Sequence, residues 1–297
     1  MANGPLGLEH PLICSRDLDQ LAARYRALGF APTPKGLHPW GTGTQLVMFP
    51  DNFIELMGIE DRSRIDVVTG SAEGPGGFRF GRFIADFLDR REGIAMVALH
   101  SRDARANLAA VEARGVPSAG LVDFRRAVRL PDGRAGEVVV TLAMLIDPDQ
   151  PQLSHFICHQ HRPELVWVPD WLHHPNGAEA ITRITYAAAD PDAVRPRFAG
   201  IWGAQAIAAE PGGFHVATAG GEFLVLDHSA CRARFAGRRM PDRWVDAPCA
   251  IAINLRVPKL MPLLAHLANN GVPASREGGT ILAGPPHAGP VILEFSE

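Results

Sequence analysis

One segment shows the organisation of this chain: Leu8-Glu9-His10-Pro11-Leu12-Ile13-Cys14-Ser15-Arg16-Asp17-Leu18-Asp19. Its apolar run predicts a short strand, and Asp17 is a residue type that favours the position just before a helix. His10 lies beside the apolar run, where an imidazole requires a hydrogen-bond partner or a functional role. The segment therefore predicts a strand, a turn and a helix start.

The residues that follow extend this start into a larger unit. Apolar residues recur at helical spacing as far as Leu28, and Gly29 is suited to end the helix. A loop rich in proline and glycine covers residues 32–44, and residues 45–49 and 53–57 have the composition of strands. The first unit is therefore a strand, a helix, a loop and further strands.

The same order of elements returns three more times along the 297 residues. The opening strands of these later units are predicted at residues 93–99, 181–186 and 249–255. Two units match closely, because Gly-Val-Pro follows the predicted helix at both 115–117 and 271–273. Recurrence at the length of a supersecondary unit is typical of an internal repeat. The sequence therefore predicts an α+β fold of four tandem βαβββ modules in two pairs.

A proline-rich segment at residues 162–178 separates the two predicted pairs. It contains three prolines, two tryptophans and a pair of histidines, which is typical of an irregular crossing. We therefore predict an N-terminal module pair over residues 1–170 and a divergent pair over residues 171–297, with the active site in the first.

Several short motifs in the N-terminal half form a recognisable set. They are Leu8–His10, Arg16–Asp19, Ala27–Phe30, His38–Thr42, Asn52–Gly58 and Gln160–Glu164 with Trp167. On these motifs the chain resembles the vicinal oxygen chelate superfamily, which contains glyoxalase I, extradiol dioxygenases and bleomycin-resistance proteins. The N-terminal half looks like a glyoxalase-like domain protein, and the C-terminal half is similar only in module architecture. The resemblance implies sheets curled around a cavity, with metal ligands on the first and last strands of modules.

Carried over by position, the resemblance implies metal ligands at His10, Glu55 and His155. His155 aligns with the last-strand position of its module, and the nearby His159 is an alternative third ligand. Two imidazoles and a carboxylate suit a divalent Fe, Mn, Zn or Ni ion, which could hold two vicinal oxygens of a substrate. Glu55 could instead act as a catalytic general base. The first-strand position of the second module is Met96, which departs from the ligand pattern.

Three further residues are candidates for substrate binding. Trp40 and Thr42 lie in a loop that either forms a mouth over the cavity or packs on the core. Arg183, at the position equivalent to His10 in the third module, either binds a substrate carboxylate bidentately or forms an ion pair with Glu294. The acidic pairs beginning at Asp17 and Asp190 are interpreted as helix caps and not as metal loops.

The composition excludes several classes of protein. A formal net charge of -3 without a long run of one sign argues against nucleic-acid binding. No apolar stretch reaches membrane-spanning length, and no signal peptide is recognisable, so a cytoplasmic location is expected. The four cysteines are scattered and are expected to be reduced. The partner is expected to be a small molecule, and the sequence leaves open whether the chain forms a homodimer.

Two functions remain after these exclusions. The first is a metal-dependent isomerase, lyase or dioxygenase that acts on a small molecule with adjacent oxygens. The alternative is a non-catalytic binding or resistance-type protein that uses the same cavity, which Met96 and the metal-poor second half favour. A structural role comes third, and a cavity filled by side chains would favour it.

Overall fold

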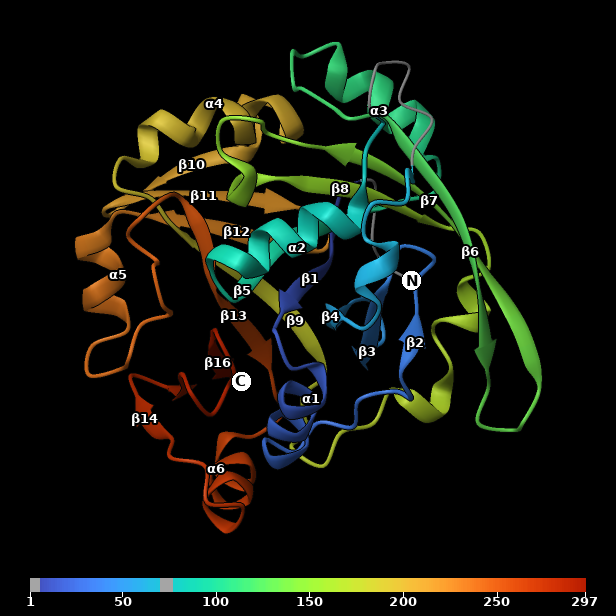
Figure 1. The fold of residues 1–297 in the computed structure, drawn as a ribbon. Coiled ribbons are helices and arrows are strands. Elements are labelled where there is room, and N and C mark those ends of the chain that lie inside the picture. The colour runs from blue at the N-terminus through green and yellow to red at the C-terminus, as the bar shows by residue number, and fades with distance from the viewer. Residues whose placement is uncertain (1–5, 70–76) are drawn as a thin grey trace.

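The computed structural model describes residues 6–69 and 77–297, which form two eight-stranded sheets (Figure 1). The first sheet contains two βαβββ modules, and its strands lie in the order β2-β3-β4-β1-β5-β8-β7-β6. The first module consists of β1 (Leu8–Cys14), α1 (Leu18–Ala27), β2 (Gly36–Leu37), β3 (Thr42–Met48) and β4 (Phe53–Ile59). The second consists of β5 (Gly93–Ser101), α3 (Ala104–Glu112), β6 (Leu121–Arg129), β7 (Ala135–Leu145) and β8 (His155–Gln160). The connecting helix α2 (Phe80–Arg90) lies between the two modules.

The second sheet repeats this arrangement, with the order β10-β11-β12-β9-β13-β16-β15-β14. The third module consists of β9 (Ala180–Ala187), α4 (Pro191–Trp202), β10 (Ile207–Glu210), β11 (Gly213–Thr218) and β12 (Gly221–Leu226). The fourth consists of β13 (Cys249–Arg256), α6 (Leu260–Asn269), β14 (Ser275–Glu277), β15 (Thr280–Ala283) and β16 (Ile292–Ser296). The connecting helix is α5 (His228–Arg234). The predicted fold of four βαβββ modules in two pairs is therefore confirmed.

Each sheet has a β-bulge at the same place in its central strand pair. In the first sheet, Leu8 pairs with Leu99 and His10 with Ala98, which leaves Glu9 as the extra residue. In the second sheet the extra residue of β9 is Thr182. A bulge changes the direction of the side chains around it. The shared irregularity shows that the two sheets are repeats in detail and not only in strand order.

Three apolar clusters hold the molecule together. The largest contains residues of both sheets and of helices α1, α3, α4 and α6, so the two sheets share one core. A second cluster fills the inner face of the N-terminal sheet beneath α2, and a smaller third one fills the inner face of the C-terminal sheet. Burial of these residues supplies most of the stabilising free energy. Among the described residues, no helix has the length and apolar character to cross a membrane.

Candidate functional site

The inner face of the N-terminal sheet contains a narrow chamber. His10 from β1, Glu55 from β4, and His38 and Trp40 from the loop before β3 line it, together with Arg126 from β6. Its volume is about 50 Å³, which is enough for a few water molecules. The chamber therefore admits a small polar group of a ligand but not a whole molecule.

His10 lies between two carboxylates in this chamber. Its Nε2 is 3.3 Å from Oε2 of Glu55, and its Nδ1 is 3.3 Å from Oε1 of Glu9. The imidazole stacks on Phe53, with 4.0 Å between the ring centroids. Neighbouring residues in a regular strand point to opposite faces, but the bulge at Glu9 turns its carboxylate toward the same side as His10. The three groups therefore form a row in which the imidazole is central.

Glu9 also connects this row to a second histidine. Its Oε2 lies 3.0 Å from Nδ1 of His100, which is near the end of β5. Both side chains are buried, and Nε2 of His100 has no hydrogen-bond partner among the described residues. Glu9 and His100 were not among the site residues predicted from the sequence. Two consecutive polar residues, Glu9 and His10, inside an apolar strand are the sequence signal from which the bulge could have been predicted.

The carboxylate of Glu55 is held from its other side as well. Thr44 donates a hydrogen bond of 2.7 Å from its hydroxyl to Oε1 of Glu55. Nε2 of His38 lies 3.9 Å from the same oxygen, and Nδ1 of His38 lies 2.9 Å from the hydroxyl of Thr42. Thr42 is completely buried and does not line the chamber. Its place beside His38 indicates that it orients that ring, whereas the sequence had suggested a contact with substrate.

These contacts set the charges of the site. Burial alone would raise the pKa of Glu55 and of Glu9, but the hydrogen bonds and charge of the histidines, His10 foremost, outweigh it and lower each to about 2. Burial likewise opposes the charged form of His10, yet its hydrogen bonds to Glu55 and Glu9 raise its pKa above the usual value. Burial lowers the pKa of His38 to about 4. Near neutral pH the site therefore holds two carboxylates, a proton on His10 and a neutral His38.

Aromatic side chains separate the chamber from a larger outer cleft. Trp40 stacks on His38 at 4.9 Å between ring centroids and meets Phe124 edge-on at the same distance. Trp40 and Phe124 also line the outer cleft, whose volume is about 550 Å³. The predicted place of Trp40 at the cavity and its predicted packing on the core thus both occur, because its ring forms the wall between the two spaces.

Arg126 is the cationic side chain of the chamber, and it was not predicted from the sequence. No hydrogen bond or ion pair joins it to another described residue. Burial lowers the pKa of Arg126, although the charge of Glu55 acts in the opposite direction. A largely buried guanidinium without a carboxylate partner is suited to binding an anionic group of a ligand.

His155 does not lie in this chamber, and its predicted role as a ligand beside His10 and Glu55 is not supported by its position. In β8 the residue that pairs with Ala98 is Phe156, and Phe156 faces His10 at 5.5 Å between ring centroids. His155 therefore points to the opposite face. The sequence alignment of β8 was one residue out of register, and a one-residue shift exchanges the two faces of a strand.

His155 instead lies in the core that the two sheets share. Its Nε2 is 3.2 Å from the hydroxyl of Tyr186, and its ring contacts Phe198, Trp202 and Phe223. The alternative ligand His159 stacks against His161, with 4.0 Å between the ring centroids, and does not line the chamber. Neither histidine completes a set with His10 and Glu55.

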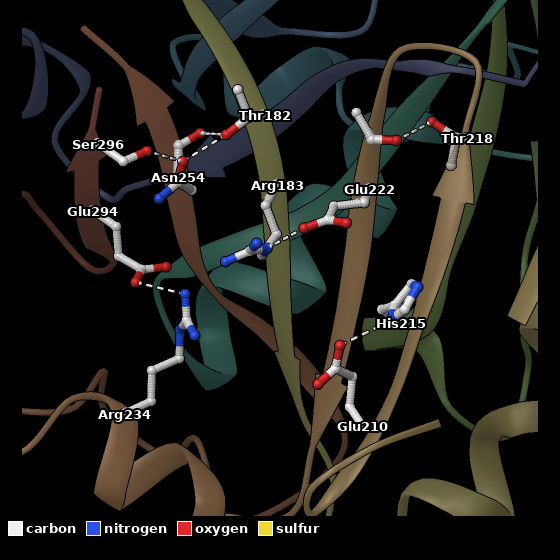
Figure 2. A network of polar contacts seen from close by, with 11 residues as sticks. Thr182, Arg183, Glu210, His215, Thr218, Glu222, Arg234, Asn254, Glu294 and Ser296 are labelled. Carbon is white, nitrogen blue, oxygen red and sulfur yellow. Dashed lines mark hydrogen bonds and ion pairs between the residues drawn. The ribbon is translucent and has the colours of Figure 1, made fainter. Parts of the chain in front are cut away.

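Arg183 lies in the other sheet, so it cannot bind a substrate held in the N-terminal chamber. It pairs with Glu222 at 2.5 Å, and Glu294 pairs with Arg234 at 2.9 Å, as Figure 2 shows. The expected ion pair between Arg183 and Glu294 was therefore wrong in its partners. Thr182 and Ser296 both donate hydrogen bonds to the side chain of Asn254 nearby (Figure 2). These polar groups of the second sheet thus pair mainly with one another, while Oε2 of Glu294 and Nε of Arg234 have no hydrogen-bond partner among the described residues.

The residues of the chamber do not fit the expected divalent metal site. Residues 6–69 and 77–297 contain no group of three or more His, Cys, Asp or Glu side chains arranged to hold a metal ion. Both nitrogens of His10 face carboxylates, which favour the protonated ring, whereas a metal requires a free nitrogen lone pair. The second module offers Met96 and Phe156 where further ligands would stand, because Phe156 pairs with Ala98 as Glu55 pairs with Leu12. The arrangement is instead suited to holding and moving a proton.

Comparisons with known proteins agree with the fold. A hypothetical protein from Staphylococcus aureus matches with a TM-score of 0.66 and 12% identity, over 98% of both chains. A mutant of 4-hydroxymandelate synthase from Streptomyces coelicolor matches with a TM-score of 0.56 and 10% identity, over 98% of this chain and 92% of that one. A fusion of a xylose isomerase-like TIM barrel with 4-hydroxyphenylpyruvate dioxygenase matches with a TM-score of 0.55 and 14% identity, over 99% of this chain and 49% of that one.

These identities are low, so the three structures bear on the fold alone. No curated protein matches the sequence. The glyoxalase-like domain matches residues 8–202, which include all four side chains of the row from His100 to Glu55. The chain therefore belongs to the glyoxalase-like domain family.

Proposed function

We propose that this protein is an enzyme that moves a proton on a small molecule whose oxygen-bearing end enters the N-terminal chamber. The observation that carries the proposal is the buried pair of His10 and Glu55, which lies at the end of an apolar chamber beside an unpaired Arg126. A carboxylate and an imidazolium 3.3 Å apart can accept a proton at one atom and return it at another. The reaction class is therefore isomerisation or lyase chemistry.

Each group has a definite role in this proposal. The carboxylate of Glu55 accepts the proton, and Thr44 orients it through its 2.7 Å hydrogen bond. The imidazolium of His10 stabilises negative charge that develops on a substrate oxygen. The guanidinium of Arg126 binds an anionic substrate group, most simply a carboxylate. The rest of the substrate occupies the outer cleft, and the rings of Trp40 and Phe124 that separate the two spaces must move aside to admit it.

The substrate class follows from the dimensions of the two spaces. A chamber of about 50 Å³ has room for one or two oxygen atoms of a ligand, and the outer cleft of about 550 Å³ has room for an apolar body. The aromatic wall favours a planar or aromatic body. We therefore propose a hydroxy or keto acid with an apolar substituent.

Deuterium exchange tests the proposal whether or not the reaction product has been identified. The protein is incubated in D₂O with a panel of aliphatic and aryl 2-hydroxy and 2-oxo acids, and loss of the C–H signal beside the oxygen-bearing carbon is followed by proton NMR. We expect catalysed exchange with at least one panel member, with or without a chelator. Glu55→Gln should slow it roughly 10²- to 10⁴-fold, which is the usual contribution of a general base.

A matched substitution separates this effect from a general loss of charge. Glu210 is an exposed carboxylate on β10 in the other half of the chain, paired with His215, so Glu210→Gln should leave the exchange rate unchanged. Arg126→Ala should raise KM more than it lowers kcat, because the proposed role of Arg126 is to bind the anionic group of the substrate. If panel members quench the tryptophan fluorescence of the protein but exchange no proton, the protein is a binding protein and the proposal is wrong.

A further inference from the structure

A second cleft, on the outside of the molecule, is lined by arginines from both halves of the chain. Its volume is about 580 Å³, and it is separate from the N-terminal chamber, since the two share no lining residue. The N-terminal half contributes four arginines and the C-terminal half two. They are Arg16, Arg24, Arg90, Arg91, Arg239 and Arg243. The loop around Pro285 and Pro290 forms the remaining wall.

The protein neutralises only part of the positive charge in this cleft. The carboxylates among its lining residues are Glu92 and Asp242. Asp242 pairs with Arg239 at 3.1 Å, and Asp246 pairs with Arg243 from just outside. The four arginines of the N-terminal half have no ion pair with any described residue. Their guanidinium groups donate instead to uncharged acceptors. These are Leu88 O for Arg16, Gln20 Oε1 for Arg24, Asp86 O for Arg90, and Glu92 O and Cys249 Sγ for Arg91.

This concentration of charge is unusual for a chain whose formal net charge is -3. Like charges in one cleft repel one another, which costs stability unless an anion occupies the space between them. Arg91 increases that cost, because its side chain is buried and its Nη2 has no hydrogen-bond partner among the described residues. The cleft is therefore organised for a negatively charged ligand.

The surrounding backbone holds these arginines in place. Arg16 follows β1, Arg24 lies in the last turn of α1, and Arg90 and Arg91 lie where α2 ends. Arg243 donates to the backbone oxygen of Arg90, so the two halves of the chain meet across the cleft. In Figure 1, α1 and the end of α2 lie beside the red C-terminal segment that supplies the opposite wall.

We propose that this cleft binds a small molecule that carries two or more adjacent phosphate groups. Guanidinium groups bind phosphate oxygens in pairs, and several forks that converge on one cleft suit a diphosphate better than a single carboxylate. The cleft volume of about 580 Å³ matches a small molecule better than a polymer. Because the ligand contacts both halves, its binding would also stabilise their packing.

Isothermal titration calorimetry of the full-length protein with inorganic pyrophosphate tests this assignment. We expect saturable binding of about one equivalent, tighter with tripolyphosphate and weaker with orthophosphate, that weakens as salt is added. The double substitution Arg24→Glu with Arg239→Glu should lower the affinity at least about tenfold. A matched pair of reversals, Arg102→Glu with Arg129→Glu, changes the net charge equally outside the cleft and should alter the affinity less than about twofold.

The other possible results of these titrations either support the polyphosphate site or overturn it. Rescue of binding by Arg24→Lys with Arg239→Lys would support a charge-based site in a folded protein. Equal loss of binding in both pairs of reversals, or no saturable heat with either polyphosphate, would overturn the site. Citrate binding as tightly as pyrophosphate would overturn the phosphate assignment. Tighter binding of a single-stranded oligonucleotide would make the cleft a nucleic-acid surface instead.

Discussion

The orientation of Glu9 decides the character of the N-terminal chamber. In a regular strand Glu9 would point away from His10, and His10 would then face one carboxylate and not two. The bulge brings both side chains to one face, so that the imidazole lies 3.3 Å from each of its acidic neighbours. A histidine between two carboxylates retains its proton, and this favours acid–base chemistry over metal binding.

Metal content is the first prediction at this scale. After dialysis and addition of one equivalent of Zn²⁺ or Fe²⁺, we expect the protein to retain well under one equivalent, measured by elemental analysis. The physical reason is that His10 must lose a proton held by two carboxylates before it can coordinate. His155→Ala should not change the retained metal, because that ring lies on the other face of the sheet.

The opposite result would have a clear meaning. One full equivalent that is lost in both His10→Ala and His38→Ala would identify a site of two imidazoles and Glu55, since His38 Nε2 lies 3.9 Å from that carboxylate. The expectation of a metal-dependent enzyme would then stand, with His38 in the place predicted for His155.

The pH dependence of stability is the second prediction at this scale. Burial lowers the pKa of His155 to about 3, with the charge of Arg197 acting in the same direction. Below about pH 6.5 the unfolded chain binds a proton at this position and the folded chain does not, so stability falls as the pH falls. Between pH 7.5 and pH 5 this histidine should cost about 2 kcal/mol of unfolding free energy.

Urea unfolding of the wild type and of His155→Phe at both pH values measures that cost. The difference in unfolding free energy between the two pH values should be about 2 kcal/mol smaller in His155→Phe. His215→Phe is the matched control, because His215 is a partly exposed histidine of β11 that pairs with Glu210. Equal pH dependence in wild type and His155→Phe would contradict the assignment.

At the scale of single elements, the modules share one way of starting their helices. The side chain of Asp17 accepts from the backbone amide of Gln20 at the start of α1, and Asp103, Asp190 and Asp227 cap α3, α4 and α5. The interpretation of the acidic pairs at Asp17 and Asp190 as caps is therefore confirmed. Helix α6 is an exception, since Lys259 precedes it and makes no side-chain cap.

The cap of α3 gives the prediction at this scale. Asp103→Ala leaves the amide of Ala106 without its 3.0 Å acceptor, so it should lower the unfolding free energy by about 1 kcal/mol. Asp103→Asn retains an oxygen at the same place and should change it by only a few tenths of a kcal/mol. Thermal unfolding followed by circular dichroism compares the two, and equal losses would refute the cap as the cause.

For the whole molecule, the decisive feature is the core that lies between the two sheets. His155 of the first sheet contacts the ring of Phe223 in the second, and Arg197 of α4 donates to the backbone oxygens of Leu145 and Leu153. Asn52 pairs with the backbone of Ile181 in both directions. The two sheets, each with its own inner cluster, thus bury a common face.

Cooperative unfolding is the prediction at this scale. Because exposing the common face of one half also exposes that of the other, we expect a single unfolding transition in urea. Two variants monitor the halves separately, one that retains only Trp40 and one that retains only Trp244, with the other tryptophans replaced by phenylalanine. Circular dichroism measures the overall stability of each variant. In each variant, the fluorescence midpoint is expected to coincide with the circular dichroism midpoint. Separated midpoints would mean that the halves are independent domains.

The sequence by itself determined the four modules, their pairing and the first two members of the site. Repeats, apolar periodicity and helix caps are local properties, and the family resemblance, carried by local motifs, implied His10 and Glu55 by their positions in the first and last strands of a module. The tertiary structure alone decided which side chains join them. The register of β8 excluded His155, the bulge at Glu9 added a second carboxylate, and the curl of the sheet brought in His38 and Arg126. A one-residue shift reverses the face of a strand, and strand pairing, which sets that register, is a contact between distant segments.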